Sequence, residues 1–395
     1  MQYRADLKSG NELSVLGFGC MRFPRGLNMK IDMDKTEKLI LAAIERGVNY
    51  FDTAYVYGGS EPALGDILQK NGVRDKINLA TKLPHQQCKS ADDFDRIFTE
   101  QCRRLHTDHI DYYLIHNLST IDCWNMLAGL GIEKWFADKK ASGQIRQVGF
   151  SFHGPQNEFM ALLEAYSWEF CQIQYNYMNE NYQAGREGLK RAHEKGLPVI
   201  VMEPLLGGKL ATGLPKKAAE LFKNANSGLT PAGWAMRWIW DQPEVTVALS
   251  GMNGEEQLND NIAAAETAAP NMLTEHEAAI YSQVVSIFRE SYKVPCTGCN
   301  YCMPCPHNVN IPGCFAAYNT SYAIGVVAGL TLYATSTGSI HPGENFSGRS
   351  CVKCGQCEKK CPQHIPIMTS LEAVTKRMEP FWFKPALALF NKISR

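Results

Sequence analysis

The sequence predicts an α/β chain in which a (β/α)8 TIM barrel is followed by a smaller, mostly α ferredoxin-like domain. Three observations lead to this prediction. Eight short apolar runs alternate with longer amphipathic ones, no G-x-G-x-x-G motif follows the first run, and eight cysteines gather near the C-terminus. Eight strand-plus-helix units are typical of a closed barrel. A doubly wound sheet would show the same alternation, but it commonly carries that glycine motif after its first strand.

Each expected strand is a short apolar run that often ends on a polar residue. Helical patterns lie between the runs: Asp34 and Glu37 resemble a capping box, and Gly47 stands where a helix is expected to end. We place the barrel at residues 1–288 and the C-terminal domain at residues 289–395. The expected strands are Leu13–Gly19, Val48–Asp52, Ile77–Lys82, Ile110–His116, Ile145–Ser151, Phe170–Tyr175, Leu197–Glu203 and Val245–Gly251.

Polar residues at the strand ends are the first candidates for chemistry, because the C-terminal strand ends line the active site in this fold. A single such residue is more often solvated or hydrogen-bonded than functional. Several of them at one barrel mouth indicate a site. The residues concerned are Asp52, Lys82, His116, Ser151 and Glu203.

Eight of the 14 cysteines form two runs, one from Cys296 to Cys305 and one from Cys351 to Cys361, each followed by proline. The second run has the C-x2-C-x2-C-x3-C-P spacing of bacterial ferredoxins, in which the fourth cysteine binds the other of two clusters. By that logic one [4Fe-4S] cluster takes Cys296, Cys299, Cys302 and Cys361, and the other takes Cys351, Cys354, Cys357 and Cys305.

Two alternatives compete with iron–sulfur clusters. The first run has only two residues before its last cysteine, and paired C-x2-C motifs also bind zinc. A disulfide framework is less expected, because we find no secretory signal in the sequence. The six other cysteines, expected to be small buried hydrophobes, are Cys20, Cys88, Cys102, Cys123, Cys171 and Cys314.

Composition argues against nucleic-acid and membrane partners. Lys plus Arg and Asp plus Glu both number 40, so the formal net charge is zero, and no electrostatic footprint for a polyanion is present. The longest apolar stretch, Ala323–Ala334, is too short for a bilayer, and we expect a packed helix there. A cytoplasmic protein is the expectation.

The segments Phe51–Gly58 (FDTAYVYG), Ala80–Lys82 (ATK) and Leu114–His116 (LIH) resemble the aldo-keto reductase family. The resemblance implies reduction of a carbonyl or oxidation of an alcohol, with Tyr57 as general acid and Asp52, Lys82 and His116 tuning and orienting it. A proton donor must reach the alkoxide that forms, and a neighbouring ammonium lowers the pKa of a tyrosine. Tyr55 is a rival, because alternate residues of an extended segment share a face.

The resemblance also implies contacts to a nicotinamide cofactor. Ser151 and Gln172 would bind its carboxamide, Met202 occupies the position of the family's stacking tyrosine, and Phe152 replaces its asparagine. Glycines and backbone donors could reach phosphates, and acids after the last strand would repel a 2′-phosphate. The cofactor is therefore expected to be NAD(P)H or FMN. The phosphate candidates are Gly207, Gly208, Ser250 and Gly251, and the acids are Glu255 and Glu256.

With both cysteine runs included, the chain resembles the branch of that family with a C-terminal 4Fe-4S ferredoxin-type domain. The resemblance implies a small-molecule substrate and, since clusters move single electrons, a flavin as go-between and a ferredoxin-like carrier as outside partner. Two alternatives stay open. Electrons could pass through a flavin to a non-carbonyl substrate, or the clusters could be purely structural.

Overall fold

The computed structural model describes the chain except residues 27, 226, 324, 338–345 and 384–395. The chain divides into two compact units, residues 1–205 with 232–274, and residues 206–231 with 275–395. The expected boundary after residue 288 falls within helix α11 (Glu275–Ser291). The structure groups this helix, together with residues 206–231, with the cysteine-rich part of the chain.

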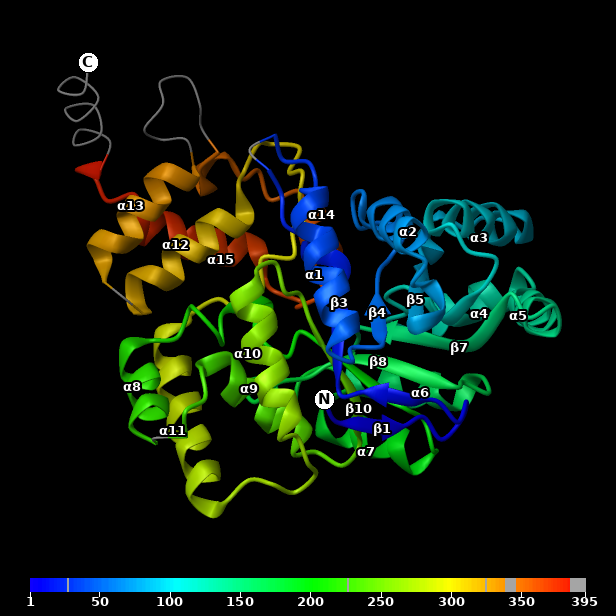
Figure 1. Ribbon diagram of the computed structural model, residues 1–395. Coiled ribbons are helices and arrows are strands. Elements are labelled where there is room, and N and C mark those ends of the chain that lie inside the picture. The colour runs from blue at the N-terminus through cyan, green and yellow to red at the C-terminus, as the bar shows by residue number, and fades with distance from the viewer. Residues whose placement is uncertain (27, 226, 324, 338–345, 384–395) are drawn as a thin grey trace. The chain divides into compact units, whose positions relative to one another are not determined.

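The first unit contains a closed parallel barrel with the strand order β10-β3-β4-β5-β6-β7-β8-β9, and Figure 1 labels several of its strands. Each of the eight expected apolar runs overlaps one barrel strand, although β5 and β7 each extend one residue further than expected, so the predicted fold class is confirmed. The strands are β3 (Leu16–Gly19), β4 (Tyr50–Asp52), β5 (Asn78–Leu83), β6 (Ile110–Ile115), β7 (Ile145–Phe152), β8 (Phe170–Gln174), β9 (Val199–Met202) and β10 (Val245–Ser250).

Helices follow the strands as a (β/α)8 chain requires, and local capping fixes several of their ends. The cap of α1 is Asp32, whose side chain accepts from the Lys35 backbone N–H, and not the expected Asp34. Gly47, with φ +91°, follows the end of that helix as expected. The helices are α1 (Met33–Glu45), α2 (Ser60–Asn71), α3 (Ala91–Leu105), α4 (Ile121–Gly129), α5 (Ile132–Ala141), α6 (Gln156–Ala165), α7 (Gly185–Glu194), α9 (Pro231–Trp240) and α10 (Glu255–Glu266).

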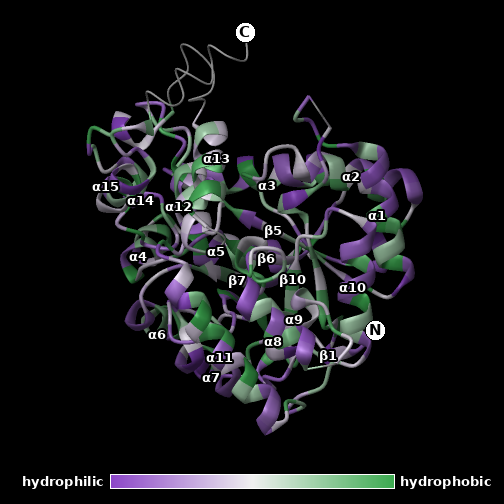
Figure 2. Ribbon diagram, turned by 90° about the vertical axis from the view of Figure 1, so that its left-hand side faces the viewer, coloured by the Kyte–Doolittle hydropathy of each residue, from purple (hydrophilic) through white to green (hydrophobic). Residues whose placement is uncertain are grey.

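The barrel interior is packed with alternate residues of the strands, because side chains point to opposite faces with a period of two. Hydrophobic and aromatic side chains fill it below the mouth, and Met202 packs against them. Figure 2 shows the outer helices with mixed hydrophilic and hydrophobic residues, as expected for elements that cover a barrel. The interior cluster consists of Leu13, Tyr50, Ala80, Tyr112, Leu114, Phe170, Ile200, Val247 and Leu249.

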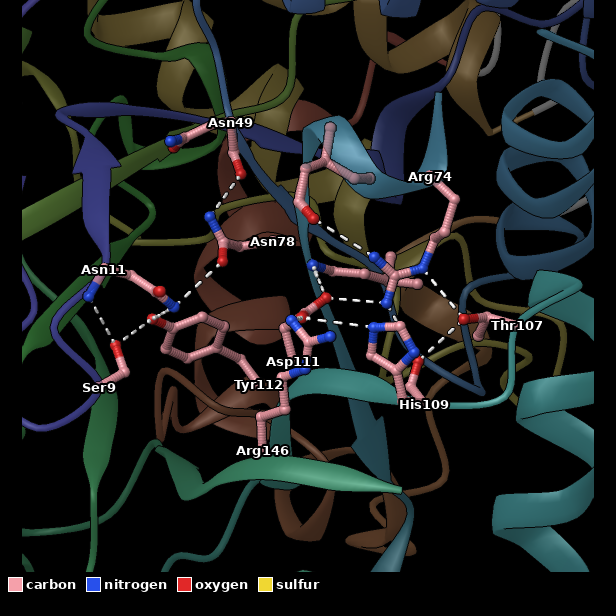
Figure 3. Close-up of polar contacts among 12 residues, drawn as sticks. Ser9, Asn11, Asn49, Arg74, Asn78, Thr107, His109, Asp111, Tyr112 and Arg146 are labelled. Carbon is pink, nitrogen blue, oxygen red and sulfur yellow. Dashed lines mark hydrogen bonds and ion pairs between the residues drawn. The ribbon is translucent and has the colours of Figure 1, made fainter. Parts of the chain in front are cut away.

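A polar network lies at the N-terminal ends of the strands (Figure 3). Asp111, at the start of β6, is buried and binds Arg74 at 2.8 Å and Arg146 at 2.9 Å. It also accepts from the Leu79 backbone N–H at 2.9 Å. Polar contacts at this end of a barrel serve stability, because the active site of such a fold lies at the opposite, C-terminal strand ends.

A hairpin that the sequence did not predict, β1 (Tyr3–Ala5) and β2 (Glu12–Ser14), joins the same network. Its buried Asp6 accepts from the Tyr112 hydroxyl at 2.7 Å, and Asn11 donates to Asn78 at 3.3 Å. Asn49 in turn accepts from the backbone N–H of Ser14 at 2.8 Å. The N-terminal segment is thus hydrogen-bonded to the start of the barrel.

The second unit is helical and carries both cysteine runs. Its helices are α8 (Lys216–Asn224), α11, α12 (Ile311–Ala323), α13 (Val326–Ser336), α14 (Gln356–Lys359) and α15 (Ile367–Met378). An apolar core that includes Phe315, Tyr333 and Leu371 packs against several of the cysteines. The helix expected at Ala323–Ala334 corresponds to α13, which starts at Val326. The first residue of the expected range, Ala323, is the last residue of α12.

No helix in the described ranges is long and apolar enough to cross a membrane. Of the six scattered cysteines, Cys20, Cys88, Cys171 and Cys314 are buried as expected, whereas Cys102 and Cys123 are only half-buried.

Candidate active site and cysteine cavities

A buried ion pair lies at the C-terminal strand ends of the barrel. The Lys82 ammonium, on β5, lies 2.6 Å from the Asp52 carboxylate at the end of β4 and 2.8 Å from the Thr53 carbonyl oxygen. Lys82 is 1% and Asp52 2% exposed. Burial raises the pKa of Asp52, and the charge of Lys82 opposes that shift. The pair therefore places a fixed ammonium at the barrel mouth.

The two other expected tetrad residues lie beside this ammonium. The Lys82 nitrogen is 5.0 Å from the ring centre of Tyr57, and the Tyr57 and His116 rings are 5.9 Å apart and nearly perpendicular. Burial lowers the pKa of His116 well below its ordinary value, and electrostatic interaction with Lys82, and with His153 and His85 when these are protonated, lowers it further. His116 is therefore neutral at pH 7 and can donate a single N–H.

The rival Tyr55 faces elsewhere. Its ring lies 4.2 Å from the Arg104 guanidinium of α3. Arg104 also binds the buried carboxylate of Glu61 at 3.1 Å, which accepts from the Thr81 hydroxyl at 2.7 Å. This arrangement fixes the segment that carries both tyrosines and leaves Tyr57 as the one beside Lys82.

The expected carboxamide-binding residues lie on neighbouring strands, since Ser151 and Gln172 are paired in register. The Ser151 hydroxyl oxygen accepts from the Asn117 backbone N–H at 2.8 Å. The Gln172 amide lies close enough to Asp52 to lower the pKa of that carboxyl. Its buried Oε1 has no hydrogen-bond partner among the described residues. Gln172 thus has an acceptor available for a ligand.

Phe152 does not reach the mouth. It is buried, and its ring lies 4.9 Å from that of Phe159 on α6. Because side chains alternate along β7, an inward Ser151 turns the next side chain outward. His153 follows, and its Nδ1 lies 3.1 Å from the Gln183 side-chain oxygen.

Gln174 is a candidate that the sequence analysis missed. It is fully buried, and neither its side-chain oxygen nor its nitrogen has a partner in the part of the chain that the structure describes. It lies two residues after Gln172, on the same face of β8, and pairs in register with Met202 of β9. A buried amide normally finds partners, so Gln174 is expected to bind a ligand. The period-two spacing from Gln172 was the available signal.

The expected phosphate-binding residues differ in their surroundings. Gly208, with φ +94°, has open space where a Cβ would lie, whereas the carbonyl oxygen of Thr297 lies 2.1 Å from that position at Gly207. Thr297 belongs to the first cysteine run, so this run packs on the backbone of Gly207. The Ser250 hydroxyl oxygen accepts from the Asn261 side chain at 2.7 Å, and the next residue, Gly251, is exposed.

The eight cysteines of the two runs line two cavities. A first cysteine cavity of about 310 Å³ and a second of about 430 Å³, both open to solvent, each contain cysteines from both runs. This grouping agrees with the crossed ligand sets expected from the sequence, and Cys302 lines both cavities. The first is lined by Cys296, Cys299, Cys302 and Cys361, and the second by Cys302, Cys305, Cys351, Cys354 and Cys357.

The chemistry of these donors suits an iron–sulfur cluster. Burial and the negative charge of the neighbouring thiolates of Cys296, Cys299 and Cys361 raise the pKa of Cys302 to about 12. Several thiolates so close together repel one another unless cations lie between them. Within the described ranges, no three His, Cys, Asp or Glu side chains are close enough to hold a single metal ion.

Comparison with known families agrees with this geometry. Residues 15–276 match the Aldo/keto reductase family. The chain belongs to this family. Residues 295–365 match the 4Fe-4S dicluster domain. The protein is therefore an aldo/keto reductase-type oxidoreductase with a C-terminal 4Fe-4S dicluster domain, as the sequence predicted.

Known relatives match about two thirds of the chain of this aldo/keto reductase. The uncharacterized oxidoreductase YrpG of Bacillus subtilis is 26% identical over 67% of this chain and 91% of that protein. The probable aldo-keto reductase 1 of Glycine max is 27% identical over 65% and 82%. Among solved structures, aldo-keto reductase AKR11C1 from Bacillus halodurans (holo form) has a TM-score of 0.60 and 26% identity over 72% of this chain and 96% of that one. An aldo-keto reductase from Klebsiella pneumoniae in complex with NADPH matches with a TM-score of 0.60 and 22% identity over 72% and 95%.

Proposed function

We propose that the barrel reduces a carbonyl group, or oxidises the corresponding alcohol, with Tyr57 as general acid and base. The observation that carries this proposal is that the Tyr57 ring lies close to both the Lys82 ammonium and the His116 imidazole. Reduction leaves an alkoxide that needs a proton, and Tyr57 supplies it. The nearby ammonium favours the phenolate that remains.

The other tetrad residues have supporting parts in this proposal. Asp52 holds the Lys82 ammonium in place through the 2.6 Å contact. His116 is neutral because it is buried, so its N–H can donate to the carbonyl oxygen and stabilise the charge that develops there. The preorganised ion pair costs no rearrangement during the reaction.

The residues above this tetrad suit a planar cofactor with an amide edge. The Gln172 side-chain oxygen and both Gln174 amide atoms are buried and have no partner among the described residues. Ser151 lies beside Gln172, and Met202 offers an apolar side chain. A related structure from Klebsiella pneumoniae contains NADP and acetate. A bound nicotinamide or flavin mononucleotide would supply the hydride. Within the barrel unit, the exposed backbone of Gly251 is a candidate for binding its phosphates.

We further propose that two [4Fe-4S] clusters occupy the two cysteine cavities with crossed ligand sets. The clusters would exchange single electrons with a ferredoxin-like carrier, and a flavin would connect them with two-electron chemistry in the barrel. The shared lining residue Cys302 supports a path between the two clusters.

Elemental and spectroscopic analysis of anaerobically purified protein tests the cofactors. Two cubanes require about eight irons and eight sulfides per chain, with broad visible absorption, and the flavin proposal requires stoichiometric FMN after denaturation. Stoichiometric zinc without sulfide would reject the clusters, and absence of flavin together with NAD(P)H-dependent turnover would reject the flavin.

The acid role of Tyr57 is tested by Tyr57→Phe with Tyr55→Phe as matched control. Because only a transition-state interaction is removed, we expect kcat to fall by about a hundredfold or more with little change in cofactor affinity. Tyr55→Phe should keep most of the activity. The reverse pattern would transfer the role to Tyr55.

A further inference from the structure

The charges of this chain are divided unevenly along the sequence. Residues 291–395 contain ten Lys and Arg but only four Asp and Glu, whereas residues 1–290 contain 30 against 36. The chain is neutral only because these two excesses cancel. The C-terminal part therefore carries an excess of positive charge, which attracts acidic molecules at long range; Lys384, Lys392 and Arg395 of this count lie outside the described residues.

Three of these basic residues, Lys353, Lys359 and Lys360, lie in the segment whose residues line the second cysteine cavity. Of the 14 cysteines, Cys354 alone is exposed, and Val352 beside it is 59% exposed. Lys353 is also exposed, pairing with Glu372. Further exposed basic side chains complete a surface that we call the basic face, which consists of His307, Val352, Lys353, Cys354, Lys359 and Lys360.

The acids near this face do not neutralise it. Glu358 is half-buried and accepts from the Met368 backbone N–H at 2.8 Å, which fixes it at the start of α15. Glu372 has Lys353 as its ion-pair partner. Lys359 and Lys360 therefore extend from α14 without an acid paired to either in the described part of the chain.

The first cysteine cavity is different. None of its described lining residues is charged, and Thr297, Pro362 and Gln363 in its wall are buried. Its cysteine run packs on the backbone of Gly207, in the segment that follows strand β9 in the chain. Of the two cavities, only the second thus has charged side chains in its described lining, and these would attract an acidic carrier.

We propose that the basic face docks an acidic one-electron carrier protein and that the second cluster is the entry point for electrons. This inference rests on the proposed function, because it requires a redox-active cluster in that cavity. The exposed Val352 provides an apolar centre and the lysines a charged rim, as in an electrostatically steered interface. Cys302, which lines both cavities, marks the side on which the two clusters would exchange electrons.

Charge reversal tests the face. The variant Lys359→Glu/Lys360→Glu is compared with Lys216→Glu/Lys217→Glu on α8, where both lysines are also exposed and the change in net charge is the same. The probe is a small acidic bacterial ferredoxin, and its dissociation constant is measured by anaerobic calorimetry. Iron and sulfide content is measured for each variant, and Lys359→Gln/Lys360→Gln serves if the reversed variant fails to fold.

We expect the basic-face variant to raise the dissociation constant about tenfold or more and the α8 variant about twofold or less. The wild-type constant should rise about tenfold between about 20 and 300 mM NaCl, since screening weakens exposed charge pairs. Stopped-flow bleaching by reduced ferredoxin should slow in parallel, while bleaching by dithionite should stay within about twofold.

Equal affinities of the two variants for ferredoxin would overturn the proposal, and so would tighter binding of wild type to anionic lipid vesicles than to ferredoxin. The outcome for the proposed function is separate. If ferredoxin binds this face and reduces the clusters but no carbonyl substrate turns over, the docking surface stands and the proposed barrel reaction falls. If ferredoxin drives carbonyl turnover equally in the basic-face and α8 variants, the proposed barrel reaction stands and the docking surface falls.

Discussion

Replacing Lys82 with methionine should separate the structural and chemical roles of the buried ion pair. Methionine keeps most of the apolar volume of the side chain but removes the cation that lies 2.6 Å from Asp52. Asp52 is fully buried, and burial already raises its pKa while Lys82 lowers it. Without Lys82, the carboxyl is expected to take up a proton.

The cost of that protonation can be worked out. An aspartate in the unfolded chain has a pKa of about 3.9, so holding it neutral at pH 7 costs about 3 units at about 1.4 kcal/mol each, or about 4 kcal/mol. This agrees with the loss of about 3–5 kcal/mol when one partner of a buried pair is removed.

The sign of the pH dependence follows from the same carboxyl. Between about pH 4 and 7 the folded variant binds one proton more than its unfolded chain, so its stability falls as pH rises, by about 1.4 kcal/mol per unit relative to wild type. At pH 5.5 the destabilisation by Lys82→Met should therefore be about 2 kcal/mol.

Guanidinium unfolding followed by tryptophan fluorescence measures these values. Six of the seven tryptophans lie in the first unit, so the signal reports on the barrel. The double variant Asp52→Asn/Lys82→Met should regain most of the stability, because neutral pairs replace buried ions at little cost, and should stay inactive. A destabilisation independent of pH, or no recovery in the double variant, would refute this reasoning.

Three further predictions concern other parts of the molecule. Gly207→Ala should lower the melting temperature and hasten cluster release, because its Cβ would lie 2.1 Å from the Thr297 carbonyl oxygen. The control Gly208→Ala places its Cβ in open space and should cost only about 1–2 kcal/mol of folding free energy for its backbone conformation. Equal effects of the two variants would contradict the Thr297 contact. Asp111→Asn should destabilise the barrel by about 3 kcal/mol, because it breaks the ion pairs of Asp111 with Arg74 and Arg146, and should leave kcat unchanged. A tenfold loss of kcat without destabilisation would contradict a purely structural role for Asp111. Burial lowers the pKa of His85, so below about pH 6.5 the unfolded chain binds one proton more at this residue than the folded protein, and the free energy of unfolding falls as the pH falls. His85→Asn should reduce the slope of stability against pH in this range by up to about 1.4 kcal/mol per pH unit. An unchanged slope would show that other groups cause it.

The barrel strands could be predicted because each is a short buried run between polar segments, and the cysteine cavities because their spacing is specific. The β1–β2 hairpin escaped prediction because its three-residue strands alternate too briefly to give a pattern. Phe152 was expected at the cofactor but packs against α6, which the alternation from Ser151 would have shown. The contact of Thr297 with Gly207 joins residues distant in the sequence, and no local pattern encodes it.

The division of the chain into units has a consequence for dissecting this protein. The chain passes from one unit to the other three times, after residues 205, 231 and 274. A fragment that stops at residue 288 would keep α8 and most of α11 but remove the core against which the second unit folds. Neither activity can therefore be isolated by a single cut, and a fusion that exchanges the cluster-bearing part must replace residues 206–231 as well.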